Sequence, residues 1–174
     1  MTAQSIQATS PVHRKGSPPK RASAARTRNK ILNILPPKEL EAVLERCEMV
    51  TIESGEIVFR RKEPILYAYF PDNCVISLVT EMEDGDAVEA MTVGNDGFVG
   101  MAIFHGVPSS RLKAIGQISG DATRLAADDF RELAREFEGL SRLLHRYSQG
   151  CCIATANSYS RQSRSRRRAT DSMS

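Results

Sequence analysis

A run of short apolar segments between Glu48 and Leu125 constrains the fold more than any other feature of this 174-residue sequence. Turn sequences separate the segments, and Asp84-Gly85 is the clearest hairpin signal among them. Many short strands with regular turns are typical of an all-β barrel or sandwich. The eight predicted strands are Met49–Ile52, Ile57–Phe59, Leu66–Phe70, Val75–Val79, Ala87–Val93, Phe98–Ile103, Leu112–Ile118 and Ala122–Leu125.

Helical patterns flank this β region on both sides. Asn29 is an acceptable N-cap for a short helix over 29–35, and apolar residues at helical spacing follow from Pro37 to Cys47. After the last predicted strand, acidic residues and an apolar side predict a helix from Asp128 to Phe137, with a break at Gly139. The sequence therefore predicts a mainly β domain with flanking α-helices.

The last helical pattern, over about 139–157, carries an apolar seam. Its members are alternately four and three residues apart, which is the spacing of a and d positions in a coiled coil. Two interpretations stay open, because two heptads are short evidence: a homodimer interface, or packing on the chain's own barrel. The seam residues are Leu140, Leu144, Tyr147, Cys151 and Ala154.

The formal net charge of +3 conceals an acidic body between two basic ends. Residues 1–28 carry six basic residues and no acid, and residues 157–174 carry five arginines and one acid. Residues 29–156 carry 13 basic and 20 acidic residues, a net of −7. Both ends are poor in large apolar residues, so we predict disordered tails at 1–28 and 158–174 around one domain at 29–157.

Targeting and membrane signals are absent from the sequence. No stretch approaches roughly 18 uninterrupted apolar residues, and the basic N-terminus lacks the apolar core of a secretory signal. The four cysteines form no C-x-x-C pair, so reduced thiols are expected. We therefore expect a cytoplasmic protein with no membrane partner.

A series of short motifs recurs along the predicted domain. They are Leu35–Leu40, Gly55–Val58, Tyr69–Pro71, Val75–Val79, Asp84-Gly85 and Val93–Met101. In this order and spacing the chain resembles, over about residues 29–157, the cyclic-nucleotide-binding-like effector domain of Crp/Fnr-type bacterial transcription regulators. The resemblance implies a double-stranded β-helix, or jelly roll, followed by a long dimerisation helix, and hence a homodimer.

The resemblance also implies a ligand segment. A cyclic phosphate prefers backbone N–H donors and a guanidinium, and a ribose hydroxyl prefers a carboxylate. Met101 stands where the family has its glutamate and Ser110 where it has its arginine, so cyclic AMP binding in the usual mode is not expected. Arg111 is one residue further, which on a strand points the side chain to the other face. The candidate ligand-binding residues are Phe98, Val99, Gly100, Met101, Ala102, Ser109, Ser110 and Arg111.

An early turn departs from the family as well. Lys62 replaces a glycine of the family in the sequence Arg60–Pro64. If that position needs a positive φ, the turn is either built differently from the family's or holds the lysine in a strained conformation.

A DNA-reading helix-turn-helix normally follows the dimerisation helix in this family. The residues after Tyr159 are too few to build one, and the basic ends contain almost no aromatic residue that could stack on bases. We therefore expect a non-enzymatic effector and dimerisation module without its own helix-turn-helix, contacting DNA only weakly or indirectly. Its partners would be a second copy, an intact relative, and a small-molecule effector whose identity the sequence does not give.

Two alternatives belong to other classes of function. One is a small-molecule sensing domain whose ligand is not a cyclic nucleotide. The other, less favoured, is a cupin-like metalloenzyme, for which His105 supplies only one ligand of the usual His-x-His arrangement. The sequence shows no nucleophile–base pair, so no catalytic residue, metal or cofactor is expected.

Overall fold

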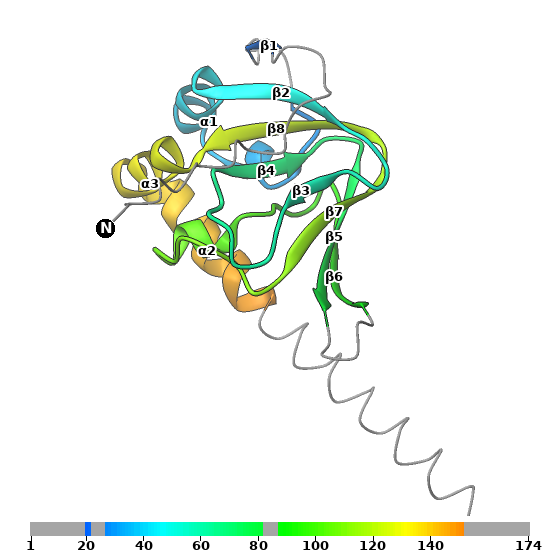
Figure 1. Cartoon of the computed structure of the whole chain (residues 1–174). Helices are drawn as coiled ribbons and strands as arrows, with labels where there is room; N and C mark the ends of the chain where they lie inside the picture. The colour runs from blue at the N-terminus through cyan, green and yellow to red at the C-terminus, as the bar shows by residue number, and fades with distance from the viewer. Residues whose placement is uncertain (1–19, 22–26, 82–86, 152–174) are drawn as a thin grey trace, which may run out of the picture.

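The computed structural model describes residues 20–21, 27–81 and 87–151, which form β-sheets with helices gathered along one side (Figure 1). A helix without a label in Figure 1 covers residues 138–151 and follows α3. Most of the two predicted tails, and Ala154, lie outside the described residues. The other elements are β1 (Lys20–Arg21), the 3₁₀ turn η1 (Leu32–Ile34), α1 (Pro37–Glu45), β2 (Cys47–Ile52), β3 (Ile57–Phe59), β4 (Tyr67–Pro71), β5 (Val75–Glu81), β6 (Ala87–Val93), α2 (Met101–Phe104), β7 (Lys113–Ile118), β8 (Gly120–Ala126) and α3 (Ala127–Glu136).

The strands form two four-stranded sheets. Sheet A has the order β1-β2-β8-β4, and sheet B has the order β3-β7-β5-β6. Every pairing is antiparallel. The predicted fold class, a mainly β jelly-roll sandwich followed by a helix, is confirmed.

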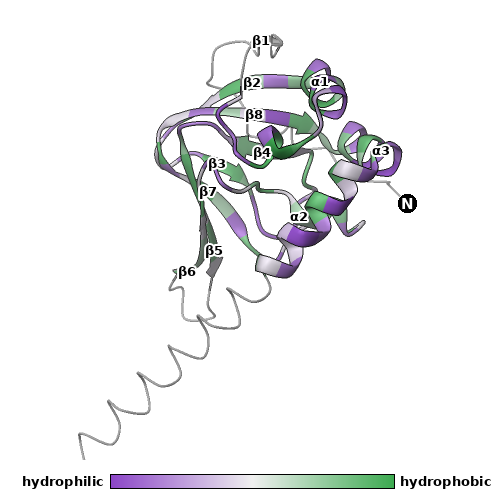
Figure 2. Cartoon of the chain, turned by 180° about the vertical axis from the view of Figure 1, so that it is seen from behind, coloured by the Kyte–Doolittle hydropathy of each residue, from purple (hydrophilic) through white to green (hydrophobic). Residues whose placement is uncertain are grey.

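The alternation of side chains along each strand creates two apolar cores. On β4, Tyr69 packs into the core between the sheets, whereas its neighbours Ala68 and Phe70 pack into the core beneath the helices. On β8, Ala122 packs into the core between the sheets and Leu125 into the core beneath the helices. Figure 2 shows the matching pattern on α1 and α3, each of which carries both hydrophobic and hydrophilic residues. Sheet A is therefore covered on both faces, and the helices belong to the fold rather than to an appendage.

One predicted strand is wrong. Residues Phe98–Ile103 form no strand: Val99 makes a single bridge to Tyr69, and the chain then enters α2. Gly100 turns the chain there with a φ of 124°, a conformation that side-chain-bearing residues rarely adopt. Apolar residues around a glycine therefore gave a strand-like pattern without a strand.

Hydrogen bonds of two buried polar side chains, Asn29 and Asp72, hold the N-terminal segment against the sheets. The Asn29 side-chain amide donates to the carbonyls of Pro71 and Gly97, each at 2.9 Å, and its oxygen accepts from two N–H groups that begin the 3₁₀ turn. The Asp72 carboxylate accepts from the Thr27 hydroxyl at 2.7 Å and the Arg28 N–H at 2.6 Å. The predicted helix at 29–35 is thus only the short turn η1, and Thr27 and Arg28 are held on the domain although we predicted them as tail.

The C-terminal helix (residues 138–151) starts from a defined break and a defined cap. Phe137 is extended, with φ −106° and ψ 112°, so the break lies two residues before the predicted Gly139. The Glu39 carboxylate of α1 accepts from the N–H groups of Gly139, at 3.2 Å, and Leu140, at 2.8 Å. These are among the N–H groups that a helix leaves without partners at its start. Glu39 therefore fixes where this helix leaves the body of the domain.

The same helix corrects part of the predicted dimer interface. Leu140 and Leu144 are 1 % and 0 % exposed, and both belong to the core beneath the helices. Side chains already buried in one chain are not available to a second copy while the helix is docked. The seam is thus used first for packing on the chain's own domain, while Tyr147 and Cys151 remain partly exposed.

Candidate functional site

The predicted ligand segment begins as part of the core. Phe98 and Val99 are 2 % and 1 % exposed, and Val99 exchanges two backbone hydrogen bonds of 2.8 Å with Tyr69 on β4. A side chain at Gly100 would place its Cβ 3.0 Å from the Ala68 backbone. The glycine therefore allows α2 to approach β4 closely.

The remaining predicted ligand residues are brought to one region but do not form a charged site. Met101 and Ala102 are half-buried and pack against the core beneath the helices. The Ser110 hydroxyl accepts from the Leu112 N–H at 3.0 Å, and Arg111 is exposed. Among these residues the structure thus places no buried carboxylate or guanidinium.

The turn between β3 and β4 adopts the conformation that the resemblance implied. Lys62 has a φ of 64° and is the one non-glycine residue with positive φ among those described. Its N–H donates to the Ser110 carbonyl at 2.8 Å, and the Ile65 N–H donates to the Pro108 carbonyl at 2.9 Å. The turn and the ligand segment are therefore joined through their backbones.

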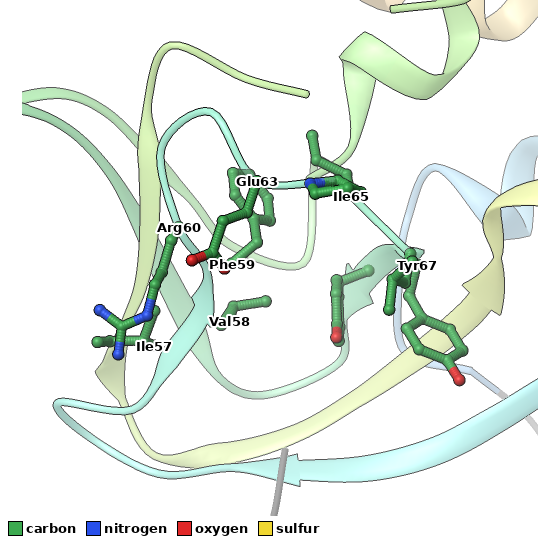
Figure 3. A pocket seen from close by; sticks show the side chains of 10 residues that line it. Ile57, Val58, Phe59, Arg60, Glu63, Ile65 and Tyr67 are labelled. Carbon is green, nitrogen blue, oxygen red and sulfur yellow. The ribbon is translucent and has the colours of Figure 1, made fainter. Parts of the chain in front are cut away.

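A pocket opens beside this turn, between β3 and β4 (Figure 3). These strands lie at the edges of sheets B and A, so the pocket occupies a gap where the two sheets do not close on each other. Its volume is about 80 Å³. It is lined by Ile57, Val58, Phe59, Arg60, Glu63, Pro64, Ile65, Leu66, Tyr67 and Tyr69.

The sequence did not reveal this pocket. None of its lining residues was among the predicted ligand residues. The only signal was a pair of apolar segments, Ile57–Phe59 and Leu66–Phe70, on either side of a charged turn, and that pattern is also typical of an ordinary hairpin. The structure thus adds a pocket beside the neighbouring turn to the predicted ligand segment.

A buried arginine stands behind the two tyrosines of the pocket. Arg124 on β8 is 6 % exposed; its Nε and Nη2 lie 2.9 and 2.8 Å from Glu48 Oε2, and its guanidinium lies 4.3 Å from the Tyr67 ring centre. Burial raises the pKa of Tyr69 to about 12, although Arg124 acts in the opposite direction. Because Glu48 neutralises its charge, Arg124 supports the pocket wall rather than offering a free anion site.

The C-terminal helix contacts residues 98–105, which begin with the predicted ligand segment. The Tyr147 ring lies 5.0 Å from the Phe98 ring, and its hydroxyl accepts from the Phe98 N–H at 3.3 Å. The His145 ring meets the Phe104 ring edge-on at 4.8 Å, and His105 Nε2 lies 2.9 Å from the Ser148 hydroxyl. Burial raises the pKa of the Tyr147 hydroxyl above its ordinary value of 10.0. A displacement of this segment would therefore change its ring contacts and hydrogen bonds with the C-terminal helix.

Two features would point to other classes of protein, a metal site and a membrane-spanning helix. Within residues 27–81 and 87–151, no three His, Cys, Asp or Glu side chains stand close enough to share a metal ion, so His105 gains no companion ligands there. Across the same part of the chain, every helix is too short or too polar to cross a membrane.

Comparison with known proteins gives structural likeness only. No family model and no curated protein matches the sequence. A cyclic nucleotide-binding domain from Methylobacillus flagellatus matches with a TM-score of 0.63 at 12 % identity, over 78 % of this chain and 80 % of that one. A mutant regulatory subunit of a cAMP-independent protein kinase A from Trypanosoma brucei, bound to cAMP in its A site, matches with a TM-score of 0.63 at 15 % identity. This match covers 78 % of the present chain but only about half of the kinase subunit, 48 %.

A transcription regulator has the same fold. CLP, the c-di-GMP-responsive global regulator of Xanthomonas campestris, matches with a TM-score of 0.61 at 16 % identity, over 72 % of this chain and 64 % of the regulator. Together with the two sheets and the closing helix, these likenesses show that the chain has the fold of a cyclic-nucleotide-binding domain.

Proposed function

We propose that this chain is the effector-sensing domain of a Crp/Fnr-type transcription regulator whose ligand is not a cyclic nucleotide held in the usual mode. The proposal rests on the resemblance, by which Met101 and Ser110 stand where the family has its glutamate and its arginine, and on the surroundings of these two residues in the structure. Met101 packs among apolar side chains, and the Ser110 hydroxyl already accepts a local hydrogen bond. Neither residue supplies the charge that a cyclic phosphate and its ribose need.

The contacts of the C-terminal helix favour a sensing role over a purely structural one. Tyr147, His145 and Ser148 each touch the segment 98–105 through a ring contact or a hydrogen bond. A ligand that moves this segment would change the energy of those contacts and so bias the helix. The likeness to a transcription regulator supports the same class of function.

The ligand side of the proposal is tested by thermal shift on the full chain. Cyclic AMP, cyclic GMP and c-di-GMP should leave the melting temperature unchanged at millimolar concentration, whereas a panel of small metabolites should contain a stabilising member. A strong shift with any cyclic nucleotide would contradict the proposal. If no compound of the panel changes the melting temperature, the domain is a scaffold rather than a sensor.

Homodimerisation, or pairing with an intact relative, is also part of the proposal. Since Leu140 and Leu144 are buried, the interface would use the partly exposed Tyr147 and Cys151, the exposed Arg142, His145 and Arg146, or residues beyond 151. Light scattering after size exclusion should give twice the chain mass, and a clean monomer at tens of micromolar would remove this part.

A further inference from the structure

We propose that the pocket between β3 and β4 binds a small zwitterionic α-amino acid with a short aliphatic side chain, such as valine or leucine. This inference rests on the proposed function, because it names the class of ligand that the sensing domain would take. The usual ligand-binding mode of this fold would use the predicted ligand residues between Phe98 and Arg111. The proposed site instead uses the turn between β3 and β4.

The inner part of the pocket selects an aliphatic group. Most of its wall consists of aliphatic and aromatic side chains, namely Ile57, Val58, Phe59, Ile65 and Tyr67. The volume of about 80 Å³ is roughly half that of an apolar cavity known to take up benzene, about 150 Å³. The space therefore suits the side chain of valine or leucine.

The rim of the pocket selects a zwitterion. Arg60 and Glu63 lie three residues apart on the same turn, and both line the pocket. Figure 3 draws Arg60 and Glu63 toward the left of the view and Tyr67 toward the right. A guanidinium pairs with a carboxylate, and a carboxylate pairs with an ammonium. An α-amino acid carries both groups on one carbon, so it can meet both rim charges while its side chain enters the apolar wall.

The turn also provides a route from the pocket to the sensing segment. Lys62 and Ile65, on either side of Glu63, donate backbone hydrogen bonds to Ser110 and Pro108. Pro64 adds a bridge to Ser109. A ligand held between Arg60 and Glu63 would restrict this turn and, through these hydrogen bonds, residues 108–110, which follow the segment 98–105 that the C-terminal helix contacts.

Isothermal titration calorimetry of the full chain with L-valine and L-leucine tests the site. We expect saturable binding near one ligand per chain. Glycine lacks the aliphatic group, isovalerate lacks the ammonium and isobutylamine lacks the carboxylate, so each should bind at least about tenfold more weakly. Equal binding of isovalerate and L-valine, or no binding of either amino acid at millimolar concentration, would overturn the inference.

Variants locate the binding. Arg60→Ala and Glu63→Ala should each weaken it about tenfold or more, because each removes one charge-assisted contact. Arg135→Ala and Glu136→Ala, on the far end of α3, are the matched controls and should bind like the parent chain. Circular dichroism melts confirm that the rim variants fold. Unchanged affinity in folded rim variants would refute the site.

The two proposals fail in different ways. Tight binding of a cyclic nucleotide would contradict the proposed function whatever the amino acids do. A stabilising metabolite of another class, with affinity untouched by Arg60→Ala, would overturn this site and leave the proposed function standing.

Discussion

Removal of the Glu39 carboxylate should loosen the C-terminal helix from the domain. Glu39 accepts two backbone hydrogen bonds at the start of that helix, from Gly139 and from Leu140, whose side chain is almost fully buried. Loss of a helix N-cap typically costs about 1 kcal/mol, and hydrogen bonds to charged groups contribute about 1.5–3 kcal/mol. We therefore expect Glu39→Ala to lower the free energy of unfolding by about 2 kcal/mol. Glu39→Gln, which keeps one acceptor oxygen, should cost about 1 kcal/mol.

Urea unfolding measures this effect, with Glu41→Ala as the matched control. Glu41 is exposed on the same helix, α1, so its loss should change the free energy of unfolding by less than about 0.5 kcal/mol. The urea dependence should keep its slope, because the surface exposed on unfolding is unchanged. Equal costs for Glu39→Ala and Glu41→Ala would refute the capping role.

A double-mutant cycle with Gly139 sharpens the test. A Cβ at residue 139 would lie 2.5 and 2.6 Å from the two Glu39 carboxylate oxygens, so Gly139→Ala should destabilise the parent chain. In the Glu39→Ala background the clash disappears, and alanine's helix preference, about 1 kcal/mol over glycine, should make the same change neutral or stabilising. Effects that add within about 0.3 kcal/mol would show that the two residues do not meet.

Three further predictions concern the rest of the domain. Lys62→Gly should raise the free energy of unfolding by about 1 kcal/mol in urea, because it relieves a lysine held at a φ of 64°; a loss of stability would show that the turn is not strained. Asn29→Ala should cost at least about 3 kcal/mol, since it leaves the carbonyls of Pro71 and Gly97 without their donor, and a cost below about 1 kcal/mol would contradict this. Burial raises the pKa of Cys47 and of Tyr69 to about 12 each, from ordinary values of 9.0 and 10.0, so the native state keeps protons that the unfolded chain releases. Stability should therefore be fully present below about pH 9 and fall as the pH rises toward 12, and urea unfolding that gives the same stability at pH 8 and at about pH 10.5 would contradict those shifts.

The strands were the most predictable part of the fold. The predicted segments Ile57–Phe59 and Ala87–Val93 match β3 and β6 residue for residue. Their apolar residues alternate or cluster between strong turn signals, so the local pattern and the tertiary structure agree. The segment Phe98–Ile103 failed because its direction depends on the backbone conformation of Gly100, which apolar patterning does not report.

The seam illustrates a different limit. The spacing of Leu140 and Leu144 predicts an apolar helix face, but the same spacing serves a coiled coil and a face packed on the chain's own core. The buried position of Leu140 and Leu144 beneath the helices favours packing on the chain's own core for these two residues. The interface with a second copy stays a prediction.

The candidate site was only partly predictable. The positions of Met101 and Ser110 came from the resemblance, and so did the meaning of Lys62, since lysine by itself gives no signal for a positive φ. The pocket between β3 and β4 arises where two sheet edges fail to meet, which depends on how strands distant in sequence are arranged. From the sequence alone, Arg60 and Glu63 therefore indicate an ordinary charged turn. Only the structure shows that they line the pocket.

Calorimetric titration of the full chain with cyclic AMP shows whether the domain binds a cyclic nucleotide in the usual mode. We expect no saturable heat at millimolar concentration, because Met101 and Ser110 cannot anchor the ribose and the phosphate. Saturable one-to-one binding at micromolar concentration, abolished by Met101→Lys or by Ser110→Glu, would contradict it.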